Sequence, residues 1–268
     1  MELRRSTLAG SFYPAESSVL RKQLKSFFAN IPDKSLSALP EPFGVVSPHA
    51  GIIFSGQTSA YAFSAIPKEF SGTFVVIGPS HTGYPDCVST ENWETPLGTL
   101  KNDNDFIKNL DIPVDNYAHR KKENSLEVQM QFIKYRFPDC QIVPILMGSQ
   151  TRRNSLSVAD KVYRAVELSE RPVKIVASSD FSHYIPDKEA RMLDNYAIDA
   201  LLNLDTAEFY QRIRDEGISA CGYGPITVMA EVSKRLGATK GIKLHYCTSG
   251  DINGDRSQVV GYASLAVV

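Results

Sequence analysis

The chain has 268 residues and a mass of 29.6 kDa, which suits one large domain with a substantial core. Its 29 Lys and Arg side chains balance 30 Asp and Glu side chains, so no basic surplus is available to neutralise phosphates, and nucleic acid is excluded as an expected partner. No apolar run approaches a membrane span and the N-terminal sequence lacks the apolar core of a signal peptide, which predicts a cytoplasmic protein with no membrane contact. The four cysteines show no CxxC pairing, so neither a zinc knuckle nor a disulfide framework is expected.

The first predicted helix covers residues 17–29, where apolar side chains recur at helical spacing. A connecting segment rich in proline and serine follows over residues 31–42. Residues 44–47 form an apolar run of strand type, which Pro48 ends because proline cannot donate a hydrogen bond to a neighbouring strand. After a turn bounded by glycines, a helix is expected over residues 57–66.

A short strand-like run followed by a histidine occurs at three places in the chain. The three pairs are 44–47 with His49, 74–77 with His81, and 175–177 with His183. The carboxyl ends of parallel strands lie on one edge of a sheet, which is where open α/β sheets bind their ligands. We therefore expect these imidazoles to converge.

Helices and strands alternate between the second and third histidines. The expected elements are a strand over 87–90, a helix over 104–110, a helix over 125–137, a strand over 141–146 and a helix over 156–168. Residues 93–97 are expected to be irregular with Trp93 as a packing residue, and the charged residues 119–123 are expected to be solvated. Pro144 places its strand at a sheet edge or at a bulge.

The C-terminal third of the chain follows the same pattern and ends in a hairpin. The expected elements are helices over 187–204, 206–214 and 225–236, and strands over 242–248 and 259–266, the last two joined by a turn at Asn253 and Gly254. No composition shift marks an internal boundary. The sequence therefore predicts a single α/β domain over residues 1–268, with a mainly parallel central sheet flanked by helices.

Three further residues have both a chemical and an ordinary interpretation. Cys221 directly precedes a predicted helix, whose N-terminus would lower the thiol pKa and favour metal binding, whereas an isolated cysteine is more often a small buried side chain. Asp180 would orient an imidazole or cap a turn. Glu127 lies in the first turn of a helix capped by Asn124 or Ser125. It would either reach the pocket or be an ordinary acidic residue that the helix dipole favours at this position.

Six segments, in order, resemble the Memo family over nearly the whole chain. They are SFYPA, SPHAGIIFSG, VVIGPSH, ENSLEVQ, SSDFSHY and ACGYGPI. The resemblance implies an α/β fold similar to that of class III extradiol dioxygenases, which use non-haem iron(II). It also implies a pathway shared with a radical-SAM protein.

The resemblance further implies which residues form the pocket. His49, His81 and Cys221 would bind a metal ion, with Asp180 and His183 beside them and His183 in the place of an acid–base histidine. Asn124 stands where the family usually has a histidine, so a proton relay through that position would lack its imidazole.

The leading hypothesis is a metal-dependent redox enzyme with a dioxygenase-like pocket. Two imidazoles and a thiolate form a soft donor set, for which iron(II) is the first expectation and copper(I) or zinc the alternatives. His183 would move a proton, Asp180 would fix its tautomer and Glu127 would support the site. The competing hypotheses are a non-catalytic module that binds a peptide or small molecule in this pocket, and a metal-assisted hydrolase.

Overall fold

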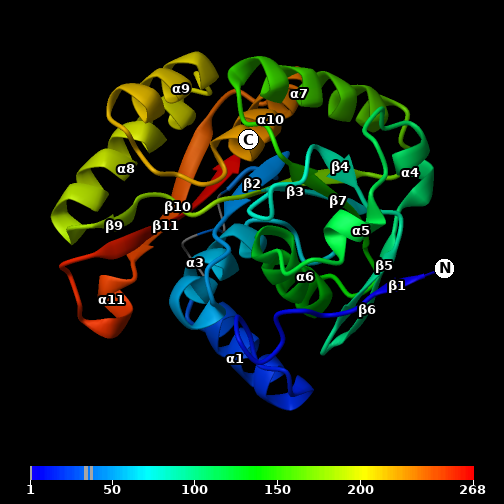
Figure 1. The fold of residues 1–268 in the computed structure, drawn as a ribbon, viewed down its shortest axis with the longest axis horizontal. Coiled ribbons are helices and arrows are strands. Elements are labelled where there is room, and N and C mark those ends of the chain that lie inside the picture. The colour runs from blue at the N-terminus through cyan, green and yellow to red at the C-terminus, as the bar shows by residue number, and fades with distance from the viewer. Residues whose placement is uncertain (1, 33–35, 37–38) are drawn as a thin grey trace.

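The computed structural model describes residues 2–32, 36 and 39–268, so part of the predicted connecting segment 31–42 lies outside the described residues. Within the described residues, eleven strands form one sheet (Figure 1). They run in the order β1 (Leu3–Arg4), β5 (Asn92–Thr95), β6 (Gly98–Asn102), β7 (Gln141–Met147), β3 (Thr73–Pro79), β8 (Val173–Ser178), β2 (Gly44–Ser47), β11 (Val259–Val267) and β10 (Gly241–Thr248), with β4 (Cys87–Val88) on β7 and β9 (His183–Ile185) on β11.

The centre of the sheet is parallel. Each neighbouring pair from β6 through β7, β3 and β8 to β2 is parallel, while β11 and β10 add an antiparallel edge. Alternate residues of the central strands face opposite sides, so that Val75 and Ile77 belong to one apolar cluster and Phe74 and Val76 to the other. The predicted fold class, an α/β domain with a mainly parallel sheet, is confirmed.

Helices cover both faces of the sheet (Figure 1). One cluster packs beneath α1 (Ser17–Ala29), α3 (Ile52–Ser64) and α6 (Asn124–Arg136), and the other beneath α7 (Arg152–Glu167), α8 (Asp187–Leu202), α9 (Thr206–Asp215) and α10 (Tyr223–Arg235). Short helices α4 (Asn104–Lys108), α5 (Asn116–His119) and α11 (Gly250–Asn253) lie in the connections. None of the described helices is long and apolar enough to cross a membrane.

Three local predictions differ from the structure, and the differences come from side-chain packing or strand pairing. Helix α3 begins at Ile52, five residues before the expected start at 57, so Gly56 lies inside the helix. A glycine is needed at this position because the Phe27 ring of α1 occupies the space that a side chain would fill. Residues 92–95 form strand β5, paired with both β1 and β6. Pro144 was expected at an edge or a bulge. It is not at an edge, because β7 pairs with β3 along its whole length, but on the other side it lies between the pairing with β6, which reaches Ile142, and the pairing with β4, which begins at Ile145.

The charged segment 119–123 is not simply solvated surface. The side chains of His119 and Glu123 are both only 1% exposed. Glu123 caps the N-terminus of α6, one residue before the expected capping position, by accepting a hydrogen bond from the backbone N–H of Ser125. Burial of this carboxylate bears directly on the pocket described below.

Candidate metal centre

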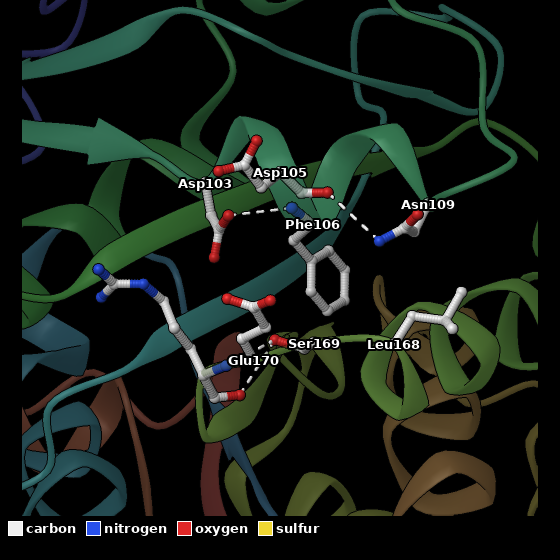
Figure 2. Close-up of a pocket in the computed structure, with 8 residues that line it drawn as sticks. Asp103, Asp105, Phe106, Asn109, Leu168, Ser169 and Glu170 are labelled. Carbon is white, nitrogen blue, oxygen red and sulfur yellow. Dashed lines mark hydrogen bonds between the residues drawn. The ribbon is translucent and has the colours of Figure 1, made fainter.

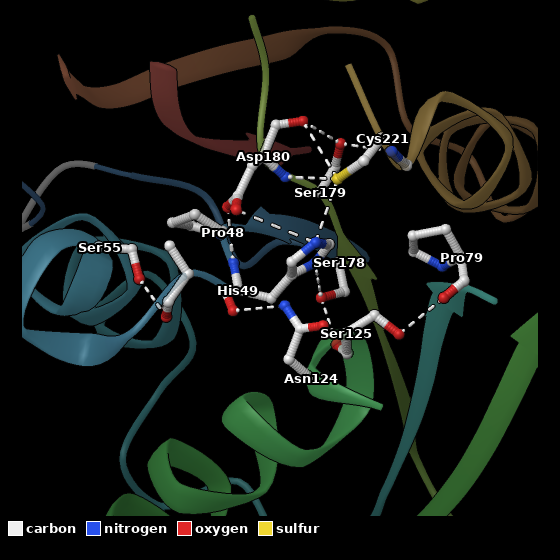
Figure 3. Close-up of polar contacts among 12 residues, drawn as sticks. Pro48, His49, Ser55, Pro79, Asn124, Ser125, Ser178, Ser179, Asp180 and Cys221 are labelled. Atoms are coloured by element: carbon white, nitrogen blue, oxygen red, sulfur yellow. Dashed lines mark hydrogen bonds and ion pairs between the residues drawn. The ribbon is translucent and has the colours of Figure 1, made fainter. Parts of the chain in front are cut away.

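Three predicted ligands meet at the carboxyl edge of the parallel sheet. His49 follows β2, His81 follows β3, and Cys221 precedes α10. Figure 3 shows His49 and Cys221 side by side, next to Ser178 at the end of β8. The donor atoms of the three side chains all lie within 4.8 Å of one another, and the two imidazole rings are 5.3 Å apart. The structure thus contains a His–His–Cys group able to hold a metal ion. His183 lines the same pocket, of about 310 Å³, so all three histidines converge as predicted.

The imidazole of His49 is held in one tautomer. The Ser178 hydroxyl donates its only proton to the backbone carbonyl of Ser125, so its oxygen accepts from both Gln129 and the Nδ1–H of His49, the latter at 2.9 Å. Burial, and then the nearby His81, lower the pKa of His49 to about 3. At neutral pH this ring is therefore uncharged, with the lone pair of Nε2 directed into the group.

The imidazole of His81 is oriented by Glu123. The Glu123 carboxylate accepts from the backbone N–H of His81 at 2.7 Å and lies 2.8 Å from Nδ1, so Nδ1 carries a proton and Nε2 is the nitrogen left to bind a ligand. The hydrogen bond to Glu123 also raises the pKa of His81. A carboxylate behind a metal-binding histidine fixes its ring and increases its basicity.

The thiol of Cys221 lies 3.1 Å from Nε2 of His49, and its Sγ accepts from the backbone N–H of Asp180 at 3.3 Å. Burial, reinforced by the Asp180 carboxyl, raises the pKa of Cys221. This direction is opposite to the lowering expected from the helix N-terminus, because burial and the Asp180 carboxyl outweigh the hydrogen bonds that lower the pKa of the thiol. Without a metal ion the protonated thiol donates to His49, whose Nε2 is a bare acceptor.

Asp180 and His183 lie in the pocket, but they do not pair as expected. The Asp180 carboxylate accepts from the backbone N–H of His49 at 2.8 Å, and burial raises its pKa to about 6. The Nδ1–H of His183 instead donates to the carbonyl of Ser219 at 2.9 Å. Ser219, not Asp180, therefore orients the His183 ring and holds a proton on its Nδ1.

Glu127 does not face the pocket, so the catalytic role expected for it is replaced by a structural one. Its buried carboxylate forms an ion pair with Arg4 and accepts hydrogen bonds from Thr7, Leu8 and Tyr13 of the N-terminal segment. Asn124 does line the pocket, and its amide donates to the carbonyl of His49 at 3.1 Å. At position 124 the chain therefore has an amide that forms a structural hydrogen bond, and not the imidazole that the family resemblance would lead one to expect.

A second hollow, of about 250 Å³, lies elsewhere, between α4 and the end of α7 (Figure 2). The carboxylates of Asp103 and Asp105 line it, but both already have partners. Asp103 caps α4 through the backbone N–H of Phe106 at 3.0 Å and accepts from Thr73, and Asp105 pairs with Lys108 at 2.6 Å. Both aspartates therefore have structural partners, and among the described residues the group able to hold a metal ion is the His–His–Cys group.

We expect Glu123→Gln to weaken metal binding by about 10- to 100-fold, the usual cost of losing a partner behind a metal ligand. The amide cannot accept both hydrogen bonds from His81 and the one from Ser125 as the carboxylate does. Competition with a chromogenic chelator would measure the affinity. Glu94→Gln, which changes a partly exposed carboxylate far from the pocket, is the control, and equal affinities for the two variants would contradict the assignment.

Comparison with known proteins identifies the family of the chain. A family model described as Memo-like protein matches residues 4–266. MEMO1 family proteins from Methanosarcina barkeri and Archaeoglobus fulgidus are 41% and 42% identical, over 99% and 98% of this chain and 100% and 98% of theirs. The crystal structure of an uncharacterized Escherichia coli K12 protein is similar in fold alone, with a TM-score of 0.53 and 12% identity over 85% of this chain and 100% of that one. The chain belongs to the Memo family.

Proposed function

We propose that this protein is a metal-dependent redox enzyme that binds its ion through His49, His81 and Cys221. Two observations carry the proposal. One ligand atom from each of the three side chains lies within 4.8 Å of the others. In both imidazoles Nδ1 is hydrogen-bonded to an oxygen, which leaves Nε2 as the nitrogen available to an ion. A metal ion such as zinc lies about 2.0–2.3 Å from each nitrogen or sulfur donor. Donor atoms within 4.8 Å of one another are therefore close enough to bind the same ion.

The protonation states also fit a cation. His49 is neutral at physiological pH and so needs no deprotonation before it binds. The Cys221 thiol must lose its proton, and a positive ion would offset the desolvation that raises its pKa. A thiolate with two imidazoles suits iron(II), copper(I) or zinc, and among these only iron and copper would support electron transfer.

When bound, a redox-active ion would supply the centre for electron transfer to oxygen or to a small-molecule substrate. His183, with Nδ1 tied to Ser219, can accept a proton at Nε2 on the wall of the same pocket. Asp180 anchors the backbone of His49 and adds a buried carboxyl beside the donors. Under this proposal an acid–base group and a metal-binding group share one small cavity.

The test is oxygen uptake by protein purified anaerobically and then loaded with iron(II) or copper(I), with ascorbate as the electron donor. Wild type is expected to consume oxygen faster than the same amount of free metal, and His183→Ala to keep the metal but lose roughly 100-fold in rate, the scale of general acid–base catalysis. Uptake no faster than free metal for either ion would overturn the proposal. Ester hydrolysis by the zinc form without oxygen would support metal-assisted hydrolysis instead.

A further inference from the structure

Tyr184 combines a strained backbone with an exposed aromatic side chain at the rim of the pocket. Its φ of 59° lies in the left-handed region, which costs a residue other than glycine about 1–2 kcal/mol. The side chain is 71% exposed, and it lines the same pocket as His49, His81 and His183.

The local pairing of β9 explains how the strain arises. His183 pairs with Val260 and Ile185 pairs with Val259, so two steps along β9 correspond to one step along β11. Tyr184 is the extra residue of this bulge. Bulges redirect a side chain and are frequent next to active sites, and here the ring is held 5.9 Å from that of His183.

Leu204 has a similar backbone strain, but its strain is offset by packing in the core. Among the described residues, Leu204 is the other non-glycine residue with a positive φ, at 53°. Its side chain is 4% exposed and packs in the core between α8 and α9, so burial offsets the conformational cost. The side chain of Tyr184 is mostly exposed, so burial does not offset the conformational cost as it does at Leu204. Strained backbone positions of this kind cluster at functional sites.

The pocket has a polar floor, and its rim carries one exposed aromatic ring. His49 and Asp180 are only 1% and 4% exposed, and they line the floor. Toward solvent the lining combines the exposed Tyr184 with the partly exposed His81 and with the half-buried Phe12 and Val260. A ligand that uses both parts of this lining has a polar group that reaches the floor and a flat apolar ring that contacts Tyr184.

We propose that Tyr184 is a ligand-contacting residue that selects for a planar ring on the substrate. This inference names a substrate class for the pocket of the proposed enzyme and so rests on that function. The ring of Tyr184 would contact the flat face of the ligand while the polar end reaches the histidines. Aromatic pairs of this kind are favoured in offset-stacked or edge-to-face arrangements.

The test uses three neutral amides of the same polar group: benzamide, cyclohexanecarboxamide and acetamide. Their dissociation constants would be measured by NMR titration of the full-length, metal-free protein, so that the result does not depend on whether metal chemistry occurs. Wild type is expected to bind benzamide about 5- to 10-fold more tightly than either of the others. Tyr184→Phe should keep this preference, and Tyr184→Gly should abolish it.

Thermal unfolding of the same variants separates ligand binding from structure. Tyr184→Gly relieves the left-handed strain and is expected to raise the Tm by about 2–4 °C while losing the ring preference. Leu204→Gly, the matched control, should lower the Tm because it removes a buried side chain. A wild type without ring preference, or a Tyr184→Gly variant that keeps it, overturns the inference, whereas loss of oxygen uptake with the preference intact would count against the redox function alone.

Discussion

Replacing Cys221 with serine is expected to weaken metal binding by about 100-fold or more, because it removes one of three donors, and losing even a supporting partner costs about 10- to 100-fold. His49→Ala should have an effect of the same size, since it removes the imidazole whose Nε2 lies 3.1 Å from the thiol. The measurement is metal content by mass spectrometry after anaerobic purification. Wild type should carry close to one ion per chain and both variants should fall to background.

The chain offers a matched control for this prediction. Cys247→Ser also removes a largely buried thiol, but this thiol lies 3.2 Å from the Thr58 hydroxyl and outside the His–His–Cys group. We expect it to keep the full metal content. Loss of metal in Cys247→Ser as well would indicate a general effect of cysteine replacement. Wild type that stays empty after exposure to iron(II), copper(I) and zinc would contradict the proposed centre itself.

The sequence predicted the histidines of this site for a reason that depends on topology alone. His49, His81 and His183 each follow a strand-like run, and parallel strands end at a common edge. Cys221 carries no such signal, and only the family resemblance placed it with the histidines. Its position depends on Gly222, because a side chain there would collide with the backbone carbonyl of Ser178. Such a close approach between distant segments cannot be inferred from local sequence.

Glu123 was missed for a different reason. It ends a run of charged residues, which is typical of solvated surface, and its burial depends on His81, 42 positions earlier in the chain. Ser219 was missed because it acts through its backbone carbonyl, which every residue has. The sequence thus located the histidines of the pocket, while Tyr184 at its rim and the groups that orient the histidines depended on tertiary contacts.

Glu127 was expected at the pocket but forms a buried ion pair with Arg4 instead. Breaking this ion pair is the change with the largest expected effect on stability. Arg4 and Glu127 are both fully buried, and the Arg4 guanidinium also donates to the carbonyl of His119 at 2.8 Å and lies 4.2 Å from the Trp93 ring. Removing one partner of a buried ion pair leaves the other charge without compensation. Arg4→Met is therefore expected to destabilise the fold by about 3–5 kcal/mol.

The neighbouring Arg5 makes this prediction specific. Arg5 also pairs with a glutamate, Glu94, but its side chain is 73% exposed, so Arg5→Met should cost less than about 1 kcal/mol. In urea unfolding the two variants should therefore differ by several kcal/mol. Adding Glu127→Leu to Arg4→Met should cost much less than the two single changes summed, because the unpaired charge is gone. Equal destabilisation by Arg4→Met and Arg5→Met would mean that the buried pair does not anchor the N-terminal segment to α6.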